Sequence, residues 1–183
     1  MKVESLILKR STYVYVASIV YVCAFFFFLN QGMWSECYET NGLSLESNMS
    51  FSLLKDDLSD FSLKNIFLTN EIYIIKNYLG IISFGIYPIV MLIYNGGFFG
   101  MFVSATIPNT GTTFVVLHTL PHSFELVPVI LSSADSLFLG VHLACRMFGF
   151  HRGEVCYLNY IKNFLLYTII IAIAAFFESY ISL

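Results

Sequence analysis

A histidine and a carboxylate lie three residues apart, at His122 and Glu125, in an otherwise apolar run of the chain. Residues at this spacing share one face of an α-helix, so the two side chains can contact each other or bind the same group. An imidazole and a carboxylate can form an acid–base pair or bind a metal, and either arrangement could activate water at a peptide bond. Inside a membrane the pair costs free energy unless it faces protein or water.

The same two residues also have a structural interpretation. Pro121 suits the first position of a helix, and Glu125 can reach back to the helix N-terminus as in a capping box. The spacing is not the His-Glu-x-x-His pattern of zinc peptidases, and no serine or cysteine with a nucleophile signature accompanies it. The chemical and the structural interpretations therefore both stay open.

The composition indicates an all-α, polytopic helical membrane protein. Of the 183 residues, 57% are hydrophobic and 11% are charged, whereas about 25% of the residues in soluble domains are charged. The apolar residues form long runs, which predict a single membrane domain over residues 1–183 with about five transmembrane helices. No basic patch is present, so nucleic acid is not an expected partner. The four cysteines are scattered without a Cys-x-x-Cys pair, and we interpret them as packing residues.

The first 70 residues divide into a helix and a polar segment. A basic start precedes the uncharged run Thr12–Leu29, which predicts an uncleaved N-terminal helix within residues 1–30. Residues 31–70 are expected to form an outer loop, and residues 71–183 the core of the domain. Within the loop, Phe51–Phe61 carries apolar residues at helical spacing, which predicts an amphipathic helix lying on the membrane or on the bundle.

The spans predicted after the outer loop are Ile72–Tyr94, Phe98–Leu120, His122–Met147 and Tyr157–Leu183. Asn95-Gly96-Gly97 is typical of a turn and is expected to separate Ile72–Tyr94 from Phe98–Leu120, the second and third transmembrane helices. Pro108-Asn109-Thr110-Gly111 is expected to break the third transmembrane helix, which requires protein or water around the break. The next span is the most polar and contains Asp135.

With these spans, lysine and arginine are more frequent on the side of the membrane that holds the N-terminus of the chain. This bias predicts a cytoplasmic N-terminus and an outer C-terminus. In this topology Glu178, near the end of the last span, reaches the same outer depth as His122 and Glu125. These three residues are the candidate catalytic or metal-binding residues, and a divalent metal is the cofactor that such a site would take. The structural alternative is a network of buried hydrogen bonds involving Asn70, Asn95 and Asp135.

Several short pieces occur in a characteristic order. They are Phe67-Leu68-Thr69-Asn70, Gly80-Ile81-Ile82-Ser83-Phe84-Gly85, Asn95-Gly96 with Gly100, Leu120-Pro121-His122-Ser123-Phe124-Glu125-Leu126 and Ala174-Ala175-Phe176-Phe177-Glu178-Ser179-Tyr180-Ile181-Ser182. From Phe67 to Ser182 the chain thereby resembles the stage II sporulation protein M-like integral membrane proteins. It departs from them at Ser123, where many members have glycine, and at Asp135-Ser136, where small residues are usual. It also ends in Ser182-Leu183, where many members have Thr-Pro.

The resemblance implies several roles, because the family is broad. One branch is a membrane scaffold for peptidoglycan-degrading partners in spore engulfment. Other members accompany ABC transporters or lie in circular bacteriocin clusters, with proposed roles in maturation, export or immunity. The engulfment branch does not keep the His122/Glu125 pair, so this chain looks closer to the broader family or the bacteriocin-associated members.

The resemblance therefore implies a scaffold or membrane subunit of a peptide maturation, export or immunity system in the bacterial cytoplasmic membrane. Its expected partners are the lipid bilayer, subunits of an ABC transporter or maturation complex, and a hydrophobic peptide. One alternative is an intramembrane metal- or acid/base-dependent hydrolase that uses His122, Glu125 and Glu178. The other is a scaffold for peptidoglycan-remodelling enzymes.

Overall fold

The computed structural model describes residues 9–39, 63–150 and 154–181, and within these ranges the regular structure is entirely helical. The helices are α1 (Arg10–Glu39), α3 (Leu63–Leu79), the 3-10 helix η2 (Gly80–Ser83), α4 (Ile86–Thr110), α5 (Thr112–Met147) and α6 (Tyr157–Ile181). The predicted all-α fold is confirmed.

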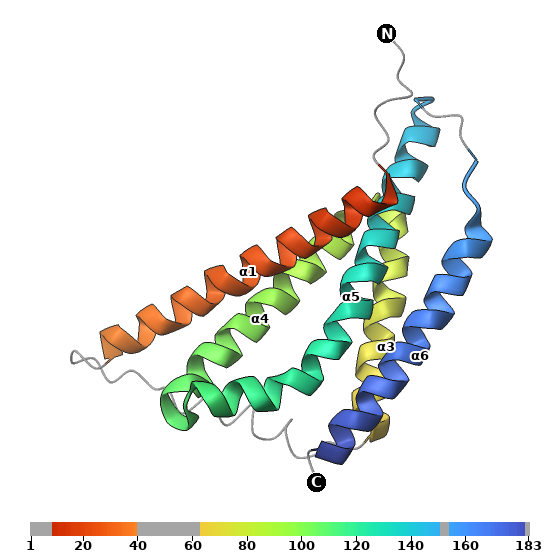
Figure 1. Cartoon of the computed structure of the whole chain (residues 1–183). Helices are drawn as coiled ribbons and strands as arrows, with labels where there is room; N and C mark the ends of the chain where they lie inside the picture. The colour runs from red at the N-terminus through yellow and green to blue at the C-terminus, as the bar shows by residue number, and fades with distance from the viewer. Residues whose placement is uncertain (1–8, 40–62, 151–153, 182–183) are drawn as a thin grey trace.

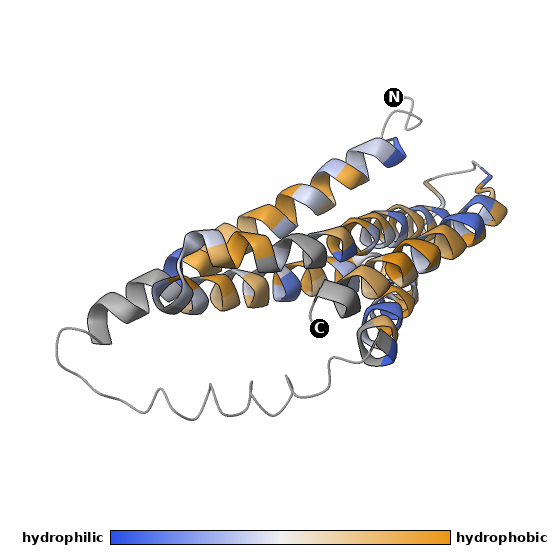
Figure 2. Cartoon of the chain, turned by 60° about the horizontal axis from the view of Figure 1, so that its bottom comes forward, coloured by the Kyte–Doolittle hydropathy of each residue, from blue (hydrophilic) through white to orange (hydrophobic). Residues whose placement is uncertain are grey.

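Among the described residues, four helical segments are long and apolar enough to cross a membrane: Arg10–Gly32, Ile86–Pro108, Ser123–Met147 and Tyr157–Phe177. Apolar residues run along the helices, and hydrophilic residues gather near several helix ends (Figure 2). The large hydrophobic side chains on these surfaces, such as Ile93, Phe102 and Ile169, are exposed and suited to lipid. The protein is therefore a polytopic membrane protein, as the composition predicted.

Consecutive helices run in alternating directions through the bundle (Figure 1). The start of α1, the α3–α4 connection and the α5–α6 connection lie at one end, which we call the N-terminal end. The end of α1, the α4–α5 connection and the end of α6 lie toward the opposite end, which we call the far end. Helix α5 contacts α1, α3, α4 and α6 and so forms the centre of the bundle. Its residues Ala134 and Leu137 pack with Tyr13, Ala17 and Leu92 in the main core.

The predicted turn at Asn95-Gly96-Gly97 is wrong, because these residues lie inside α4. In a membrane an unbroken helix satisfies all its own backbone hydrogen bonds, so glycine is tolerated there. The glycines instead allow α1 to approach. A Cβ atom on Gly96 would lie 2.6 Å from the carbonyl oxygen of Tyr21, and one on Gly100 would lie 2.4 Å from that of Phe25. Gly96 and Gly100 thus form a Gly-x-x-x-Gly contact between α4 and α1.

The predicted second span, Ile72–Tyr94, is also interrupted, since α3 ends at Leu79 and α4 begins at Ile86. Phe84 and Gly85 both have positive φ values, 55° and 88°, which end η2 and redirect the chain. Pro88 was expected to kink a helix but lies in the first turn of α4. Backbone N–H groups in the first turn have no acceptor within the helix, so a proline there breaks no hydrogen bond.

The expected break near Pro108 is present but separates different helices from those predicted. Pro108 lies within the last turn of α4, and Gly111, at φ 83°, joins α4 to α5. Residues of the predicted third span are therefore divided between two helices. The first turns of α5 run across the far end before the helix turns along α3 and α6 (Figure 1). Pro121 and Pro128 both fall within the sequence of α5, so Pro121 is not at the first position of a helix.

Two further boundaries concern the N-terminal part. Helix α1 continues to Glu39, past the end predicted at residue 30, and α3 begins at Leu63, inside the segment expected to be loop. The amphipathic helix predicted over Phe51–Phe61 lies outside the described residues. The last helix begins at Tyr157, as predicted.

Candidate functional site

A carboxylate of α5 lies completely buried where this helix meets the start of α1. Asp135 of α5 is 0% exposed, and its Oδ1 accepts a hydrogen bond of 2.6 Å from Nε of Arg10 in the first turn of α1. The second oxygen, Oδ2, accepts a bond of 3.1 Å from Nη2 of the same guanidinium. The two groups thus form a two-point ion pair, the geometry in which arginine and carboxylate bind most specifically.

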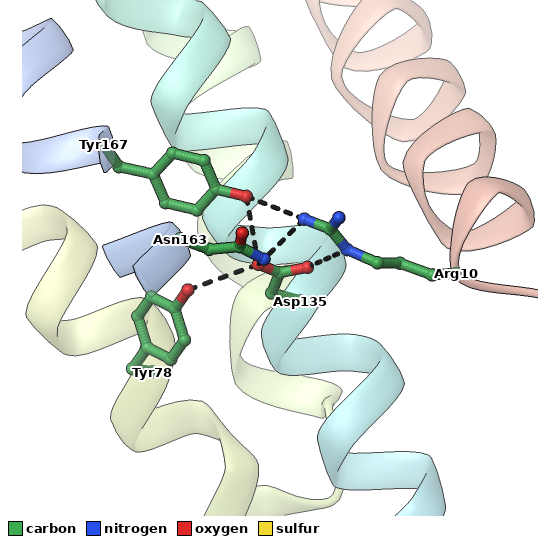
Figure 3. A network of polar contacts seen from close by, with 5 residues as sticks. All are labelled: Arg10, Tyr78, Asp135, Asn163 and Tyr167. Carbon is green, nitrogen blue, oxygen red and sulfur yellow. Dashed lines mark hydrogen bonds and ion pairs between the residues drawn. The ribbon is translucent and has the colours of Figure 1, made fainter. Parts of the chain in front are cut away.

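Three more side chains donate to the same carboxylate oxygen (Figure 3). Oδ2 of Asp135 accepts bonds from the amide of Asn163 at 2.9 Å, the hydroxyl of Tyr167 at 3.0 Å and that of Tyr78 at 3.3 Å. The Tyr167 hydroxyl also accepts a bond of 2.9 Å from Nη2 of Arg10. We call Arg10, Tyr78, Asp135, Asn163 and Tyr167 the Asp135 network.

The Asp135 network joins four helices: α1, α3, α5 and α6. A carboxylate removed from water needs both a cation and further hydrogen bonds, because its desolvation costs several kcal/mol, on the order of the attraction it gains. Arg10 keeps contact with solvent, since 43% of its side chain is exposed. The network therefore fixes the start of α1 against the interior of the bundle.

A second polar cluster lies between α3 and α5. Asn77 is 0% exposed, and its amide nitrogen donates to the hydroxyls of Ser132 at 3.0 Å and Ser133 at 2.9 Å. Glycine Gly80 follows one turn later, and a Cβ atom there would lie 2.5 Å from Pro88. Small and amide-bearing residues thus bring α3, α4 and α5 close together, as is usual between membrane helices.

The three residues predicted to form a chemical site lie on two helices. Glu125 of α5 is 2% exposed, so its carboxyl group is inside the bundle. His122 also lies on α5, and Glu178 lies near the end of α6. Both helices bring these positions toward the far end (Figure 1). The side chains of His122 and Glu178 lie outside the described part of the chain, so their distance from Glu125 stays a prediction.

The predicted network of Asn70, Asn95 and Asp135 stays a prediction. Asn70 on α3 and Asn95 on α4 are half-buried, whereas Asp135 lies in its own network with Arg10. Among the described side chains, no group of three or more His, Cys, Asp or Glu could hold a metal ion.

Sequence reasoning missed Arg10, Tyr78, Asn163 and Tyr167 as partners of Asp135. An aspartate in an apolar run does signal the need for a cation. The basic start of the chain, which includes Arg10, indicated only the orientation of the protein in the membrane.

A cavity of about 370 Å³ lies beside the ion pair at the N-terminal end. Its polar lining comes from α1, α5, α6 and the connection before α6: Arg10, His142, Glu154, Asn159, Tyr160 and Asn163. It therefore combines a cationic and an anionic side chain around one space.

The model of the family described as stage II sporulation protein M matches residues 13–183, so the match includes α1 as well as the region of the resemblance from Phe67 onward. No curated protein and no solved structure matches the chain. Since the family model covers nearly the whole chain, this protein belongs to the stage II sporulation protein M family.

Proposed function

We propose that this protein is a scaffold or membrane subunit of a peptide maturation, export or immunity system. The observation that carries the proposal is the Asp135 network, in which donors from three other helices surround one carboxylate of α5. A charge held in this way fixes the packing of helices, because exchanging its partners would expose a buried carboxylate. A bundle held in one arrangement provides the fixed surface that a scaffold needs.

The peptide-handling role rests on the resemblance around His122 and Glu125. The resemblance implies that the engulfment branch does not keep this pair, so the chain looks closer to the broader family or to the bacteriocin-associated members. The partners that follow are subunits of an ABC transporter or maturation complex and a hydrophobic peptide. The alternative that the resemblance implies is a scaffold for peptidoglycan-remodelling enzymes in spore engulfment, and the family description, stage II sporulation protein M, names sporulation but no partner.

One observation favours a chemical alternative. Glu125 is 2% exposed in the half of α5 that contains the bend, and a carboxyl group inside a membrane bundle is a functional candidate. If His122 and Glu178 join it, the three residues could act as an acid–base or metal-dependent hydrolase. A carboxyl group can also be retained there for packing alone, so the two roles must be separated by experiment.

Assembly is the first test of the scaffold role. The tagged chain is co-expressed with the products of its neighbouring genes, and the complex recovered from membranes is quantified. We expect a stable complex that Arg10→Ala reduces, because the Asp135 network then loses its cation. Arg146→Gln, at an exposed arginine outside the network, is the control and should leave the yield unchanged. A chain recovered only as an isolated protein would contradict the scaffold role.

The proposed location is the bacterial cytoplasmic membrane, with the N-terminus inside. Cys156 is exposed in the connection before α6 at the N-terminal end, whereas Cys37 lies near the end of α1 that points to the far end. Single-cysteine variants treated with a membrane-impermeant thiol reagent should therefore react from opposite sides, Cys37 from outside and Cys156 from the cytoplasm. Labelling of both from the same side would exclude this topology.

A further inference from the structure

A further carboxyl group lies inside the bundle, at Glu71 of α3. Its Oε1 accepts a hydrogen bond of 2.9 Å from the hydroxyl of Thr168 on α6, and the two helices run side by side (Figure 1). Thr168 is close to the middle of the candidate span Tyr157–Phe177, so this contact lies deep within the membrane. A charge at that depth needs a partner, because lipid and apolar side chains do not solvate it.

Apolar side chains enclose the contact between Glu71 and Thr168. The residues one turn before and one turn after each of the two belong to one hydrophobic cluster: Phe67, Ile74, Phe164 and Ile171. The lysines of α3, Lys64 and Lys76, are exposed. Among the described residues, no basic side chain forms an ion pair with Glu71. Glu71 therefore lacks a cation of the kind that Arg10 supplies to Asp135.

Among the described residues, none forms a hydrogen bond with the second oxygen of Glu71. The residue is half-buried, but this atom, Oε2, is inaccessible to solvent. Protonation at Oε2 would give an O–H without an acceptor, and protonation at Oε1 would leave Oε2 equally unpaired. A water molecule could bond to Oε2 but would leave the charge uncompensated. A bound cation both contacts Oε2 and neutralises the carboxylate.

The oxygens at this contact suit an alkali cation. Oγ1 of Thr168 lies 2.9 Å from Oε1 of Glu71 and 3.1 Å from the carbonyl oxygen of Phe164. Carboxylate, hydroxyl and carbonyl oxygens are ligands of hard cations. One carboxylate balances one positive charge, and no group of three or more His, Cys, Asp or Glu in the described part of the chain would hold a multivalent ion.

We propose that Glu71, Thr168 and the carbonyl group of Phe164 bind an alkali cation between α3 and α6. The cation neutralises the carboxylate of Glu71 and holds the two helices together at the middle of the membrane. The stability of the chain then depends on the alkali cation in the medium. The site goes beyond the scaffold role and does not depend on it.

The test follows the thermal unfolding of the whole purified chain in detergent micelles. Sodium chloride, potassium chloride and choline chloride are compared at one ionic strength, so that general salt screening is the same in all three. We expect the melting temperature to rise saturably, by several degrees, as Na⁺ or K⁺ replaces choline. Equal melting temperatures in the three salts would overturn the proposal. A melting temperature that changes with pH but not with the alkali cation would also overturn it, because a proton would then neutralise Glu71.

Glu71→Gln removes the charge and keeps the shape of the side chain. The cation dependence should disappear, and the melting temperature in choline chloride should not fall, because no carboxylate remains buried. Thr168→Val removes one ligand and should raise the half-saturating cation concentration several-fold. Glu154→Gln, at an exposed carboxylate outside the site, is the control and should keep the full dependence. An alkali-cation dependence that survives Glu71→Gln would overturn the assignment of the site.

Discussion

Arg10→Ala is expected to lower the free energy of unfolding by about 3 kcal/mol, the lower end of the range for breaking a buried ion pair. The variant leaves the carboxylate of Asp135 buried, at 0% exposure, with only neutral donors. Asp135→Asn should cost less, about 1–2 kcal/mol, because the half-exposed Arg10 can then turn to water and only hydrogen bonds are weakened. The asymmetry follows from the unequal burial of the two partners.

Reversible unfolding in mixed micelles measures both variants and the double variant. In Arg10→Ala/Asp135→Asn no carboxylate remains to be buried, so part of the loss caused by Arg10→Ala alone should be recovered. Equal losses for the two single variants, or a double variant whose loss equals the sum of the single losses, would show that the pair does not act as described.

Gly100→Ala is expected to separate α1 from α4 and to cost about 2 kcal/mol, within the range for overpacked contacts. The added Cβ atom would lie 2.4 Å from the carbonyl oxygen of Phe25 and 2.9 Å from the backbone nitrogen of Leu29. Both neighbours are backbone atoms, so no side chain can turn away to make room. The helices themselves must move, and the contact centred on Gly96 would loosen with them.

The measurement is the unfolding free energy together with cross-linking between cysteines placed on α1 and α4. Val90→Ile is the control, because it adds bulk to α4 at a side chain that is 54% exposed. The control should keep both the stability and the cross-linking efficiency. Undiminished stability and cross-linking in Gly100→Ala would mean that α1 and α4 do not pack through these glycines.

Long apolar runs were enough to predict the helical membrane fold, but the glycines were misassigned. Asn95-Gly96-Gly97 is typical of a turn in soluble proteins, where water can bind the freed backbone groups. In the membrane the helix continues, and Phe84 and Gly85 form the break instead. The spacing of Gly96 and Gly100, four residues apart, was the signal for a helix contact. The face that α1 would occupy depends on tertiary packing, which local patterns do not contain.

The candidate site was predicted only in part for a similar reason. The sequence identified Asp135 as a buried polar residue, but its cation is 125 positions away on another helix. Nothing local distinguishes Arg10 from the other basic residues near the predicted spans. Tyr78 and Tyr167 also belong to helices that join α5 only after folding. The group of His122, Glu125 and Glu178 stays a prediction, with Glu125 buried on α5 as a site of this kind requires.

The most direct test of the scaffold role uses a Glu125→Gln variant and measures its output, which is peptide release or immunity, relative to the amount of assembled complex. The amide keeps the shape of the buried side chain but cannot act as a base or as an anionic metal ligand. Peptide release or immunity is measured in cells that carry the neighbouring genes, and is divided by the amount of complex recovered from the same membranes. The scaffold account predicts an unchanged ratio, even if less complex forms. A normal amount of complex with its output abolished would contradict the account and assign Glu125 to chemistry.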